Sequence, residues 1–369
     1  MKSILVTGAE GFIGRNLVLA LNRLPDVRVF TADLDTPTEE WSAAFAECDV
    51  VVHLAGVNRP QKEEDYEAGN VGSLSDVLAA LGSAAKLQLI ILSSSTQALL
   101  GNPYGRSKRL AEQLLFEFSE KTGTPIRVFR LPGVFGKWSR PNYNSVIATF
   151  CYNISRGIPI QVSDASMEIE IVYVGDVVSS IIGLIGIAQD GAAFVDVEPV
   201  FKISLGRLAR KLSEFYESRA TLRAVDLSNP LDRRLYGTFV SYLPTDGFAY
   251  CLSRKSDFRG DLAEIWKTRD YGQFFISRTK PGMGRGNHYH DTKVEKFLVV
   301  EGHGLIRFRN VTTGETVEYR LTGRDFQVVD IPPGWTHSIQ NVGEGEMVVL
   351  FWASEVFDAE RPDTYPAEV

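Results

Sequence analysis

Residues 93–108 hold side chains that together can protonate a carbonyl oxygen: three serines in a row, then Tyr104 and Lys108. Tyr104 and Lys108 are four residues apart, so at the start of a helix both side chains lie on one face. A phenol with a pKa of about 10 is a poor acid at neutral pH, and a nearby ammonium lowers that pKa by stabilising the phenolate. A hydroxyl upstream, of Ser95 or Ser94, would hold a substrate oxygen beside the phenol. These groups predict a proton donor for a carbonyl that receives a hydride.

A Tyr-x-x-x-Lys pair arises by chance in most chains of this length, and a helix cap with a surface lysine is the competing interpretation. The start of the chain favours the catalytic one. Residues 2–7 predict a buried strand that ends in Gly8-x-x-Gly11-x-x-Gly14, and a helical pattern follows at residues 15–24. Glycines at this spacing allow a tight turn and let a pyrophosphate approach the backbone at a helix N-terminus.

Further apolar runs follow at the intervals of a parallel sheet. We expect strands at residues 27–32, 48–55, 87–92 and 126–129, and helices at residues 38–45, 71–81 and 110–121. Strands that alternate with helices predict an α/β fold with a doubly wound sheet. The second strand ends at Asp33, where an acid suits the 2′-hydroxyl of an adenosine ribose and repels a 2′-phosphate. An aspartate that caps a turn is the alternative there.

The composition indicates a two-domain cytoplasmic protein. Its 369 residues are too many for one ordinary domain, and 44% apolar residues are enough for two cores. A net charge of −7 without a basic tract argues against a nucleic-acid partner. The three cysteines form no C-x-x-C pair, which fits reduced thiols. The chain has neither a signal-peptide pattern nor an apolar run of membrane-spanning length, so no membrane partner is expected.

Several motifs occur together in a fixed order: the glycine loop, His53-Leu-Ala-Gly56, Asn70, the serine run, Tyr104-x-x-x-Lys108 and Arg130-Leu-Pro-Gly-Val-Phe-Gly136. Over about residues 1–240 the chain therefore resembles the extended short-chain dehydrogenase/reductases, Rossmann-type enzymes that act on nucleotide sugars. The resemblance implies Tyr104 as acid/base, Lys108 as its partner on the nicotinamide ribose, and Ser95 as the catalytic hydroxyl with Ser94 in reserve. It implies these cofactor-binding residues: Gly8, Gly11, Phe12, Ile13, Gly14, Asp33, Leu54, Ala55, Gly56, Tyr104 and Lys108.

Two features concern the substrate. Only eight residues separate Ser95 from Tyr104, so the loop usual in this family is nearly absent and a more open cleft is expected. Residues 137–145 gather cations, amides and aromatic rings, which suit a diphosphate and a uracil ring. Asn144 is the candidate there by resemblance, with Arg130 as a further substrate-binding residue. A polar surface loop is the alternative for residues 137–145.

Beyond Pro244-Thr-Asp-Gly247 the pattern changes to β-rich segments with glycine turns, which predicts domains at residues 1–243 and 244–369. The second domain contains three histidines and a glutamate that predict a site for a divalent ion, with zinc preferred. The four proposed ligands are His288, His290, Glu295 and His337.

The spacing of these residues resembles the paired motifs of the cupin β-barrel. The first motif is Gly282-x5-His288-x-His290-x4-Glu295-x6-Gly302, and the second is Pro332-x-Gly334-x2-His337-x3-Asn341. The second motif has Phe326 where a glycine is expected. Asp257-Phe-Arg-Gly260 and Arg285-Gly-Asn-His288 resemble carbohydrate epimerases that act on 4-keto-6-deoxy nucleotide sugars. Their first histidine is the base, which conflicts with a metal-ligand role for His288. The base is left open among Lys296, Tyr289 and His303, and a structural ion is the alternative.

The joined domains resemble a family of bifunctional capsular-polysaccharide enzymes on the route to UDP-N-acetyl-L-fucosamine. The resemblance implies C3 epimerisation of a UDP-2-acetamido-2,6-dideoxy-4-ketohexose by the cupin, then C4 reduction to UDP-2-acetamido-2,6-dideoxy-L-talose. The C3 proton is acidic only while C4 is a ketone, so epimerisation comes first. The resemblance implies NADPH, with Arg15 as a 2′-phosphate contact, whereas Asp33 argues for NADH. We expect a homodimer.

Two other functions stay open from the sequence. One is a single-function nucleotide-sugar reductase or 4-epimerase whose cupin is a dimerising module. The other is a non-catalytic sensor of redox state or metabolites. Sensors of this fold typically lose the tyrosine or the lysine, and both are present here.

Overall fold

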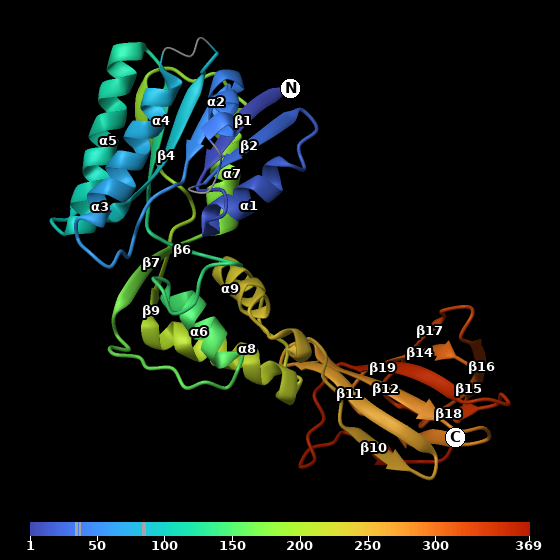
Figure 1. Ribbon diagram of the computed structural model, residues 1–369. Helices are drawn as coiled ribbons and strands as arrows, with labels where there is room; N and C mark the ends of the chain where they lie inside the picture. The colour runs from blue at the N-terminus through green and yellow to red at the C-terminus, as the bar shows by residue number, and fades with distance from the viewer. Residues whose placement is uncertain (34–35, 37, 83–85) are drawn as a thin grey trace. The chain divides into compact units, whose positions relative to one another are not determined.

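A six-stranded parallel sheet runs through the first of two structural units (Figure 1). Its strand order is β2-β1-β3-β4-β5-β8, and every adjacent pair is parallel. The bounds are β1 Lys2–Thr7, β2 Val27–Ala32, β3 Val50–His53, β4 Leu89–Ser95, β5 Ile126–Leu131 and β8 Ala192–Val195. The computed structural model describes residues 1–33, 36, 38–82 and 86–369. The predicted α/β sheet is confirmed.

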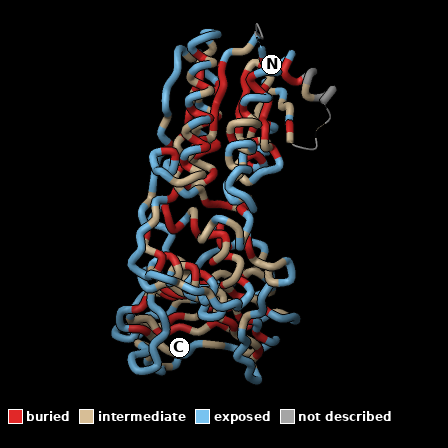
Figure 2. Tube along the Cα trace, turned by 60° about the vertical axis from the view of Figure 1, so that its left-hand side comes forward, coloured by how far each residue is buried: buried red, intermediate tan, exposed pale blue. Residues whose placement is uncertain are grey.

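Helices cover both faces of this sheet (Figure 1). α1 (Phe12–Leu21) and α7 (Val174–Ile185) pack on one face, and α2 (Thr38–Glu47), α4 (Ser73–Leu81) and α5 (Pro103–Thr122) pack on the other. Successive strand side chains point to opposite faces, so Ile4 and Val6 join one core and Leu5 joins the other. Figure 2 shows the resulting lines of buried residues along the strands.

The strand order places a ligand crevice beside β1. From β1 the chain passes to β2 on one side, and later returns to β3 on the other side of β1. Doubly wound sheets bind ligands outside the carboxyl ends of their strands at such a reversal. Gly8 follows β1 and Leu54 follows β3, so both loops open onto this crevice.

The rest of the first unit forms a smaller layer. Its three-stranded sheet comprises β6 (Gly133–Phe135), β7 (Glu168–Tyr173) and β9 (Phe201–Ser204). The helices near it in the chain are α6 (Val146–Ile154), α9 (Pro230–Val240) and the first part of α8 (Leu205–Thr221), whose residues from Glu214 onward belong to the second unit. Short turns are α3 (Asp65–Glu67), η1 (Ala68–Gly72), η2 (Thr96–Leu99) and η3 (Thr245–Gly247).

Two antiparallel sheets form the second unit, as the predicted all-β domain requires. One has the order β10-β11-β12-β19-β14-β17, and the other β16-β15-β18-β13-β20. The first comprises β10 Arg254–Asp257, β11 Gly260–Thr268, β12 Gly272–Thr279, β19 Met347–Ala353, β14 Glu295–Glu301 and β17 Val328–Ile331. The second comprises β16 Thr316–Thr322, β15 His303–Asn310, β18 Trp335–Asn341, β13 Gly284–Tyr289 and β20 Tyr365–Pro366. Side chains from both, including Phe297 and Ile306, form one core.

The division between the units differs in part from the boundary expected after residue 243. The first unit holds Met1–Ser213 and Leu227–Thr245, and the second holds Glu214–Asp226 and Asp246–Val369. Backbone hydrogen bonds tie the short inserted segment to β11: the Lys267 N–H donates to Leu222 O at 2.9 Å, and the Ala224 N–H donates to Lys267 O at 2.8 Å. Composition does not signal such a pairing between segments far apart in the chain.

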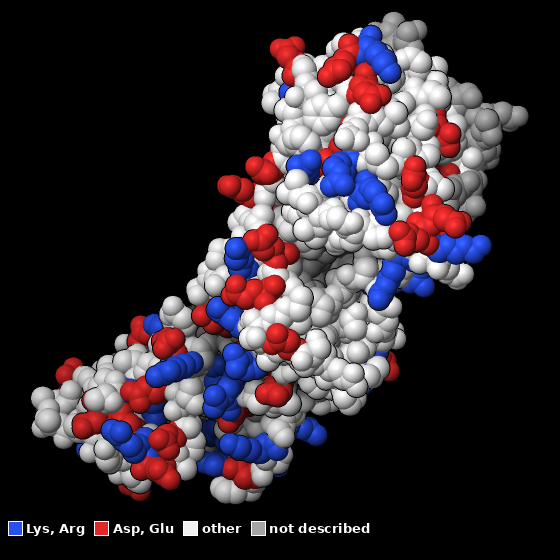
Figure 3. Space-filling model, turned by 90° about the vertical axis from the view of Figure 1, so that its left-hand side faces the viewer, with Lys and Arg blue, Asp and Glu red and all other residues white. Residues whose placement is uncertain are grey.

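Acidic and basic side chains are interspersed on the face drawn in Figure 3. Lys202 and Glu170 form one exposed pair of this kind, 2.9 Å apart. Exposed pairs contribute little to stability, so the fold depends on its buried cores. Among the described helices, none has both the length and the apolar character needed to cross a bilayer.

Candidate functional site

The glycine-rich loop joins β1 to α1 at the carboxyl edge of the parallel sheet. Gly8 has a φ of +67°, and a Cβ there would lie 2.6 Å from the backbone nitrogen of Ala55. A Cβ at Gly14 would lie 2.1 Å from the Gly8 carbonyl oxygen, so neither position admits a side chain. Gly11 caps α1 without a side-chain bond, and the first turn holds no acidic residue. The positive end of this helix is therefore open to a diphosphate.

Asp33 lies beside this loop. Its carboxylate accepts a hydrogen bond from the Glu10 N–H at 3.1 Å. A negative charge is thus held where a doubly wound fold receives an adenosine ribose. Arg15, the expected 2′-phosphate contact, pairs with Glu10 at 3.1 Å, and both side chains are exposed.

The loop after β3 links the glycine loop to the catalytic candidates. A Cβ at Gly56 would lie 2.6 Å from Asn70 Oδ1 and 3.1 Å from Lys108 Nζ. Asn70 in turn donates to the Val57 carbonyl and to Ser107, at 2.8 and 3.0 Å. The other predicted cofactor residues lie on the same two loops and at the start of α1: Phe12, Ile13, Leu54 and Ala55.

Tyr104 and Lys108 occupy the first turns of α5. The helix starts at Pro103, seven residues before the predicted start, because the Asn102 side chain caps it with a 2.7 Å bond to the backbone. Lys108 Nζ lies 6.0 Å from the centroid of the Tyr104 ring. It donates to the Ser93 carbonyl at 3.3 Å, so the ammonium is fixed at the end of β4.

Ser95 completes this group. Its hydroxyl accepts a hydrogen bond from the Gln97 N–H at 3.2 Å and lies close enough to the Tyr104 phenol to lower the pKa of that group. The phenol ring packs against Tyr66 with centroids 5.7 Å apart. Burial raises the pKa of Tyr104, and the Ser95 hydroxyl offsets this only in part. The lowering of this pKa expected from Lys108 is therefore not seen, because desolvation of the phenol is the largest effect on it. Burial also lowers the pKa of Lys108, to about 8.

Glu112 contacts two other predicted site residues, Ser94 and Arg130. This carboxylate is buried, accepts a 2.5 Å bond from the Ser94 hydroxyl, and pairs with Arg130 at 2.6 Å. The Arg130 guanidinium also lies 4.1 Å from the centre of the Phe194 ring. A buried carboxylate needs such partners. The geometry favours Ser95 over Ser94. Arg130 has a structural partner in Glu112, and its contact with substrate stays a prediction.

Asn144 lies in the turn before α6 and is exposed. Next to it, the Tyr143 carbonyl accepts a hydrogen bond from Arg59, which follows β3. The Arg140 guanidinium lies 5.2 Å from the centre of the Tyr143 ring. The predicted gathering of cations and aromatic rings thus exists as a surface loop, and the substrate role of Asn144 stays a prediction.

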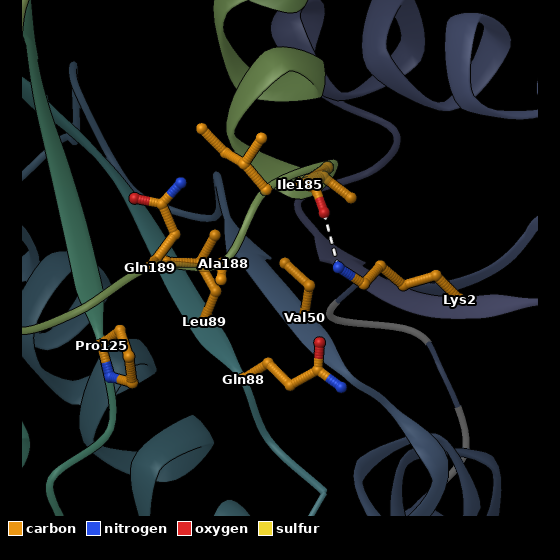
Figure 4. A pocket seen from close by; sticks show the side chains of 9 residues that line it. Lys2, Val50, Gln88, Leu89, Pro125, Ile185, Ala188 and Gln189 are labelled. Atoms are coloured by element: carbon orange, nitrogen blue, oxygen red, sulfur yellow. Dashed lines mark hydrogen bonds between the residues drawn. The ribbon is translucent and has the colours of Figure 1, made fainter.

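A cavity of about 360 Å³ lies at the opposite edge of the sheet (Figure 4). Lys2, Val50 and Leu89 line it, and they are the first residues of β1, β3 and β4. Lys2 Nζ donates to the Ile185 carbonyl at 2.6 Å. The glycine loop and Tyr104 follow the carboxyl ends of the strands, so this cavity is separate from the candidate active site.

Four side chains of the second unit converge as predicted: His288, His290, Glu295 and His337. Their nitrogen and oxygen ligand atoms all lie within 4.8 Å of one another. Antiparallel pairing of β13 with β18 sets His288 opposite His337. One Glu295 oxygen lies 3.3 Å from His290 Nε2 and 3.4 Å from His337 Nε2. The spacing of the sequence thus becomes a single cluster.

The buried histidines present the atoms that a metal ion needs. His290 Nδ1 lies 2.6 Å from the Asp363 carbonyl, and His337 Nδ1 lies 3.4 Å from the Trp335 carbonyl. Both Nε2 atoms are buried without a well-formed hydrogen bond to any described group. An Nδ1–H that donates to a carbonyl leaves the Nε2 lone pair free for a metal. This donor set fits a divalent ion such as zinc.

The charges of the cluster point the same way. Burial alone would raise the pKa of Glu295, but His290 and His337 hold it below its usual range. Burial and the two neighbouring imidazoles lower the pKa of His288 to about 4. An ionised Glu295 carboxylate and a neutral His288 imidazole are protonation states that bind metal.

Comparison with known proteins decides the family. Residues 4–192 match the model of the NAD dependent epimerase/dehydratase family, and residues 255–365 match the polysaccharide biosynthesis C-terminal domain. The chain is 44% identical over 366 residues to UDP-2-acetamido-2,6-beta-L-arabino-hexul-4-ose reductase of Pseudomonas aeruginosa, covering 99% of this chain and 98% of that protein. The chain belongs to the NAD dependent epimerase/dehydratase family.

Solved structures agree with this membership. The capsular polysaccharide assembling protein CapF from Staphylococcus aureus has a TM-score of 0.93 and 45% identity, over 99% of this chain and all of that one. The UDP-N-acetylglucosamine 4-epimerase of Methanobrevibacter ruminantium has a TM-score of 0.55 and 19% identity, over 65% of this chain and 98% of that one. The second likeness shows only the fold.

None of the three candidates for the epimerisation base lies at the cluster of His288, His290, Glu295 and His337. Lys296 follows Glu295 on β14, so it points to the opposite face, where it forms an exposed ion pair with β17. Tyr289 stacks on Tyr365 with ring centroids 5.2 Å apart. His303 begins β15, five residues from the position that pairs with His337, or ~17 Å along the strand.

Two residues that shape these sites were not predicted from the sequence. Glu112 lies one helical turn beyond Lys108, so a helix drawn from Pro103 would have shown it on the same face. Asp363 lies 73 residues from His290, which it contacts, and no local pattern marks it.

Proposed function

We propose that the first unit reduces the C4 ketone of a UDP-linked 2-acetamido-2,6-dideoxy-4-ketohexose. The observation that carries this proposal is the placement of the Ser95 hydroxyl beside the Tyr104 phenol, with Lys108 one turn away and the glycine loop nearby. The name of the Pseudomonas aeruginosa relative, a ketohexose reductase, supports the same substrate class.

A bound reduced nicotinamide dinucleotide would supply the hydride to C4 of the sugar. Ser95 would hold the ketone oxygen beside the phenol. Because burial raises the pKa of Tyr104, the phenol is protonated at neutral pH and gives its proton to that oxygen. The phenolate that remains is stabilised by the Lys108 ammonium, and a proton from solvent restores the phenol. The ketone becomes an alcohol, and the dinucleotide is oxidised.

Two features bear on the identity of the dinucleotide. Resemblance of the whole chain to the capsular-polysaccharide enzymes favours NADPH. The carboxylate of Asp33 beside the glycine loop favours NADH, because it repels a 2′-phosphate. Arg15 is exposed and can turn toward such a phosphate only by leaving Glu10. The proposal therefore includes both donors, with the ratio of their kcat/KM values as the measurement.

For the second unit we propose C3 epimerisation of the same ketone, before its reduction. A proton at C3 is removed and returned on the other face of the sugar, which the neighbouring ketone makes possible. The metal ligands are His288, His290, Glu295 and His337, and a bound zinc ion would polarise a sugar oxygen as a Lewis acid. The match to a polysaccharide biosynthesis domain supports this role.

One observation favours a second candidate function, a 4-reductase with a structural barrel. Lys296 pairs outside the barrel, Tyr289 stacks on Tyr365, and His303 lies ~17 Å along its strand from the cluster position. An ion held by four protein ligands without a neighbouring base is typical of a structural site.

We also propose that the chain forms a homodimer through the outer face of the six-stranded antiparallel sheet. Cross-strand pairing lines apolar side chains in rows on this face, and Trp266 and Val328 are 49% and 53% exposed. Apolar faces of this kind mark protein interfaces. The rows comprise Trp266, Phe274 and Trp352, then Ile276, Leu350, Leu298 and Val328. Light scattering of Leu350→Arg should show a monomer where the native chain shows a dimer.

One experiment separates the two functions. The full chain is incubated with the UDP-linked 4-keto-6-deoxy-N-acetylhexosamine in deuterated water, with and without NADPH, and the products are identified by NMR. Deuterium at C3 without NADPH and the L-talose product with it would support both proposals. Reduction without deuterium at C3 would leave the reductase alone, and no reduction with either dinucleotide would overturn the proposed function of the first unit.

A further inference from the structure

The C-terminal end of the chain lies along the strand that carries the first metal ligand. β20 pairs with β13, with Pro366 opposite His288 and Tyr365 opposite Tyr289. The Ala367 N–H donates to the Asn287 carbonyl at 3.0 Å, which continues the pairing. Residues 362–367, here called the C-terminal clasp, thus add a strand beside the cluster.

Asp363 in the clasp holds both a metal ligand and the loop that follows it. Its carbonyl accepts the 2.6 Å bond from His290 Nδ1. Its carboxylate accepts backbone hydrogen bonds from Asp291, Thr292 and Lys293 at 2.9, 3.0 and 2.8 Å. The Thr292 hydroxyl adds a bond of 3.1 Å. One side chain therefore fixes three consecutive residues after His290.

Lys293 anchors the clasp from the other direction. Its residue is 7% exposed, and its ammonium donates to the Pro362 carbonyl at 2.9 Å and to the Thr364 hydroxyl at 3.0 Å. Both partners flank Asp363. The loop holds the clasp and the clasp holds the loop, so the position of His290 depends on contacts made 70 or more residues away.

We infer that the C-terminal clasp positions the metal ligands, and that Asp363 is the positioning residue. The inference rests on the proposed metal centre and goes beyond its four ligands. A histidine whose Nδ1–H is held by a carbonyl presents Nε2 in one direction, so less freedom is lost when the ion binds. A substitution of Asp363 keeps the carbonyl that holds His290 but removes the carboxylate that anchors it, and loss of such support for a metal ligand typically weakens metal affinity by about 10- to 100-fold.

The test uses the full chain with Asp363→Asn and Asp363→Gly. Asp363 has a φ of 40°, a left-handed conformation that asparagine and glycine both tolerate, so the backbone can stay in place. Asp358→Asn is the matched control, because its carboxylate accepts a 2.9 Å bond from Glu360 within its own turn. Zinc affinity is measured by competition with a chromophoric chelator, and the Tm of the metal-free protein is measured beside it.

We expect zinc affinity to fall at least tenfold in both Asp363 variants and to stay unchanged in Asp358→Asn. The Tm of the metal-free variants should stay near that of the native chain, while the rise in Tm on adding zinc shrinks. Equal zinc affinity in native and Asp363 chains would overturn the inference and leave the metal centre standing. If zinc affinity falls but the metal-free variants are also unfolded, the inference would be overturned as well. Asp363 would then only stabilise the barrel. A native chain that binds no zinc would overturn the metal centre and the inference together.

Discussion

The Ser94 hydroxyl donates a 2.5 Å hydrogen bond to the buried carboxylate of Glu112. Its neighbour Ser95 points to the other side of β4, because successive strand side chains alternate, and its hydroxyl lies beside the Tyr104 phenol. Two adjacent serines therefore have different tasks. One satisfies a buried charge, and the other faces the reacting groups.

Alanine substitutions should separate these tasks. Ser95→Ala should lower kcat for ketone reduction by about 100-fold, the usual size of a lost acid-base element. Ser94→Ala should leave kcat within about threefold and lower the free energy of unfolding by about 1 kcal/mol, because Glu112 loses one donor. Steady-state kinetics and urea unfolding give the two values. A larger loss of kcat in Ser94→Ala than in Ser95→Ala would contradict the assignment.

Tyr104→Phe should abolish reduction while sparing the second unit. The change removes only the phenolic oxygen, so NADPH oxidation should fall by a factor of about 100 or more. Deuterium exchange at C3 should continue at the native rate, because the metal ligands lie in the other unit. Tyr66→Phe is the control, since Tyr66 packs against the same ring. Native NADPH turnover in Tyr104→Phe would remove the tyrosine from the mechanism.

The pH dependence of reduction should follow Lys108. Its ammonium, with a pKa lowered to about 8 by burial, stabilises the phenolate only while protonated. The raised pKa of Tyr104 keeps the phenol protonated over the same range. The rate should therefore be flat below about pH 8 and fall up to tenfold per unit above it. In Lys108→Arg, whose guanidinium keeps its charge, this fall should vanish even if the overall rate is low. A native rate that is flat up to pH 10 would exclude the role.

The sequence predicted the parallel sheet well because its signals are local. Residues 2–7 and 27–32 coincide with β1 and β2, since each apolar run is bounded by turn residues. The start of α5 was placed seven residues late because Pro103 and the Asn102 cap were not recognised as a helix start. The two histidine-containing motifs together predicted a single cluster of side chains. Residue type and spacing were enough for that prediction, because alternate side chains on a strand point to the same side.

Contacts between segments far apart in the chain could not be predicted from the sequence. The ion pair of Arg130 with a buried carboxylate on α5 was not predicted. Residues 214–226 were placed with the first domain, although their backbone pairs with Lys267. Asp363 shows no pattern at all, because its partners lie about 70 residues earlier in the chain. Each case depends on which surfaces meet, and a linear pattern does not encode that.

Asp33 should control the choice of dinucleotide. Its carboxylate is held at the glycine loop by the Glu10 N–H, so it repels the 2′-phosphate of NADPH. Asp33→Asn keeps a hydrogen-bond acceptor and removes the charge. The ratio of kcat/KM for NADPH to that for NADH should rise about tenfold, which corresponds to 1.4 kcal/mol. Glu47→Gln is the control, because that exposed carboxylate pairs with Arg28 near the start of β2, away from the glycine loop. An unchanged ratio in Asp33→Asn would exclude the contact.

The last prediction concerns the metal ion and the order of the two reactions. The purified chain should carry about one divalent ion, and His290→Ala combined with Glu295→Ala should remove it, because these side chains supply two of the four ligands. Elemental analysis of protein prepared without chelators measures the ion. His303→Ala is the control, since that histidine is exposed at the start of β15.

In the metal-free double variant, deuterium exchange at C3 should be lost and the ketone should be reduced slowly. The epimerised ketone, supplied directly, should be reduced at the native rate, because Ser95, Tyr104 and Lys108 lie in the other unit. In the unepimerised ketone, the C3 substituent points the other way at the face of the sugar that receives the hydride. We therefore expect its reduction to be slow. If the double variant reduces both ketones as fast as the native chain, then epimerisation does not precede reduction. The ion would in that case serve the stability of the barrel alone, and its loss would lower the barrel's Tm without changing catalysis.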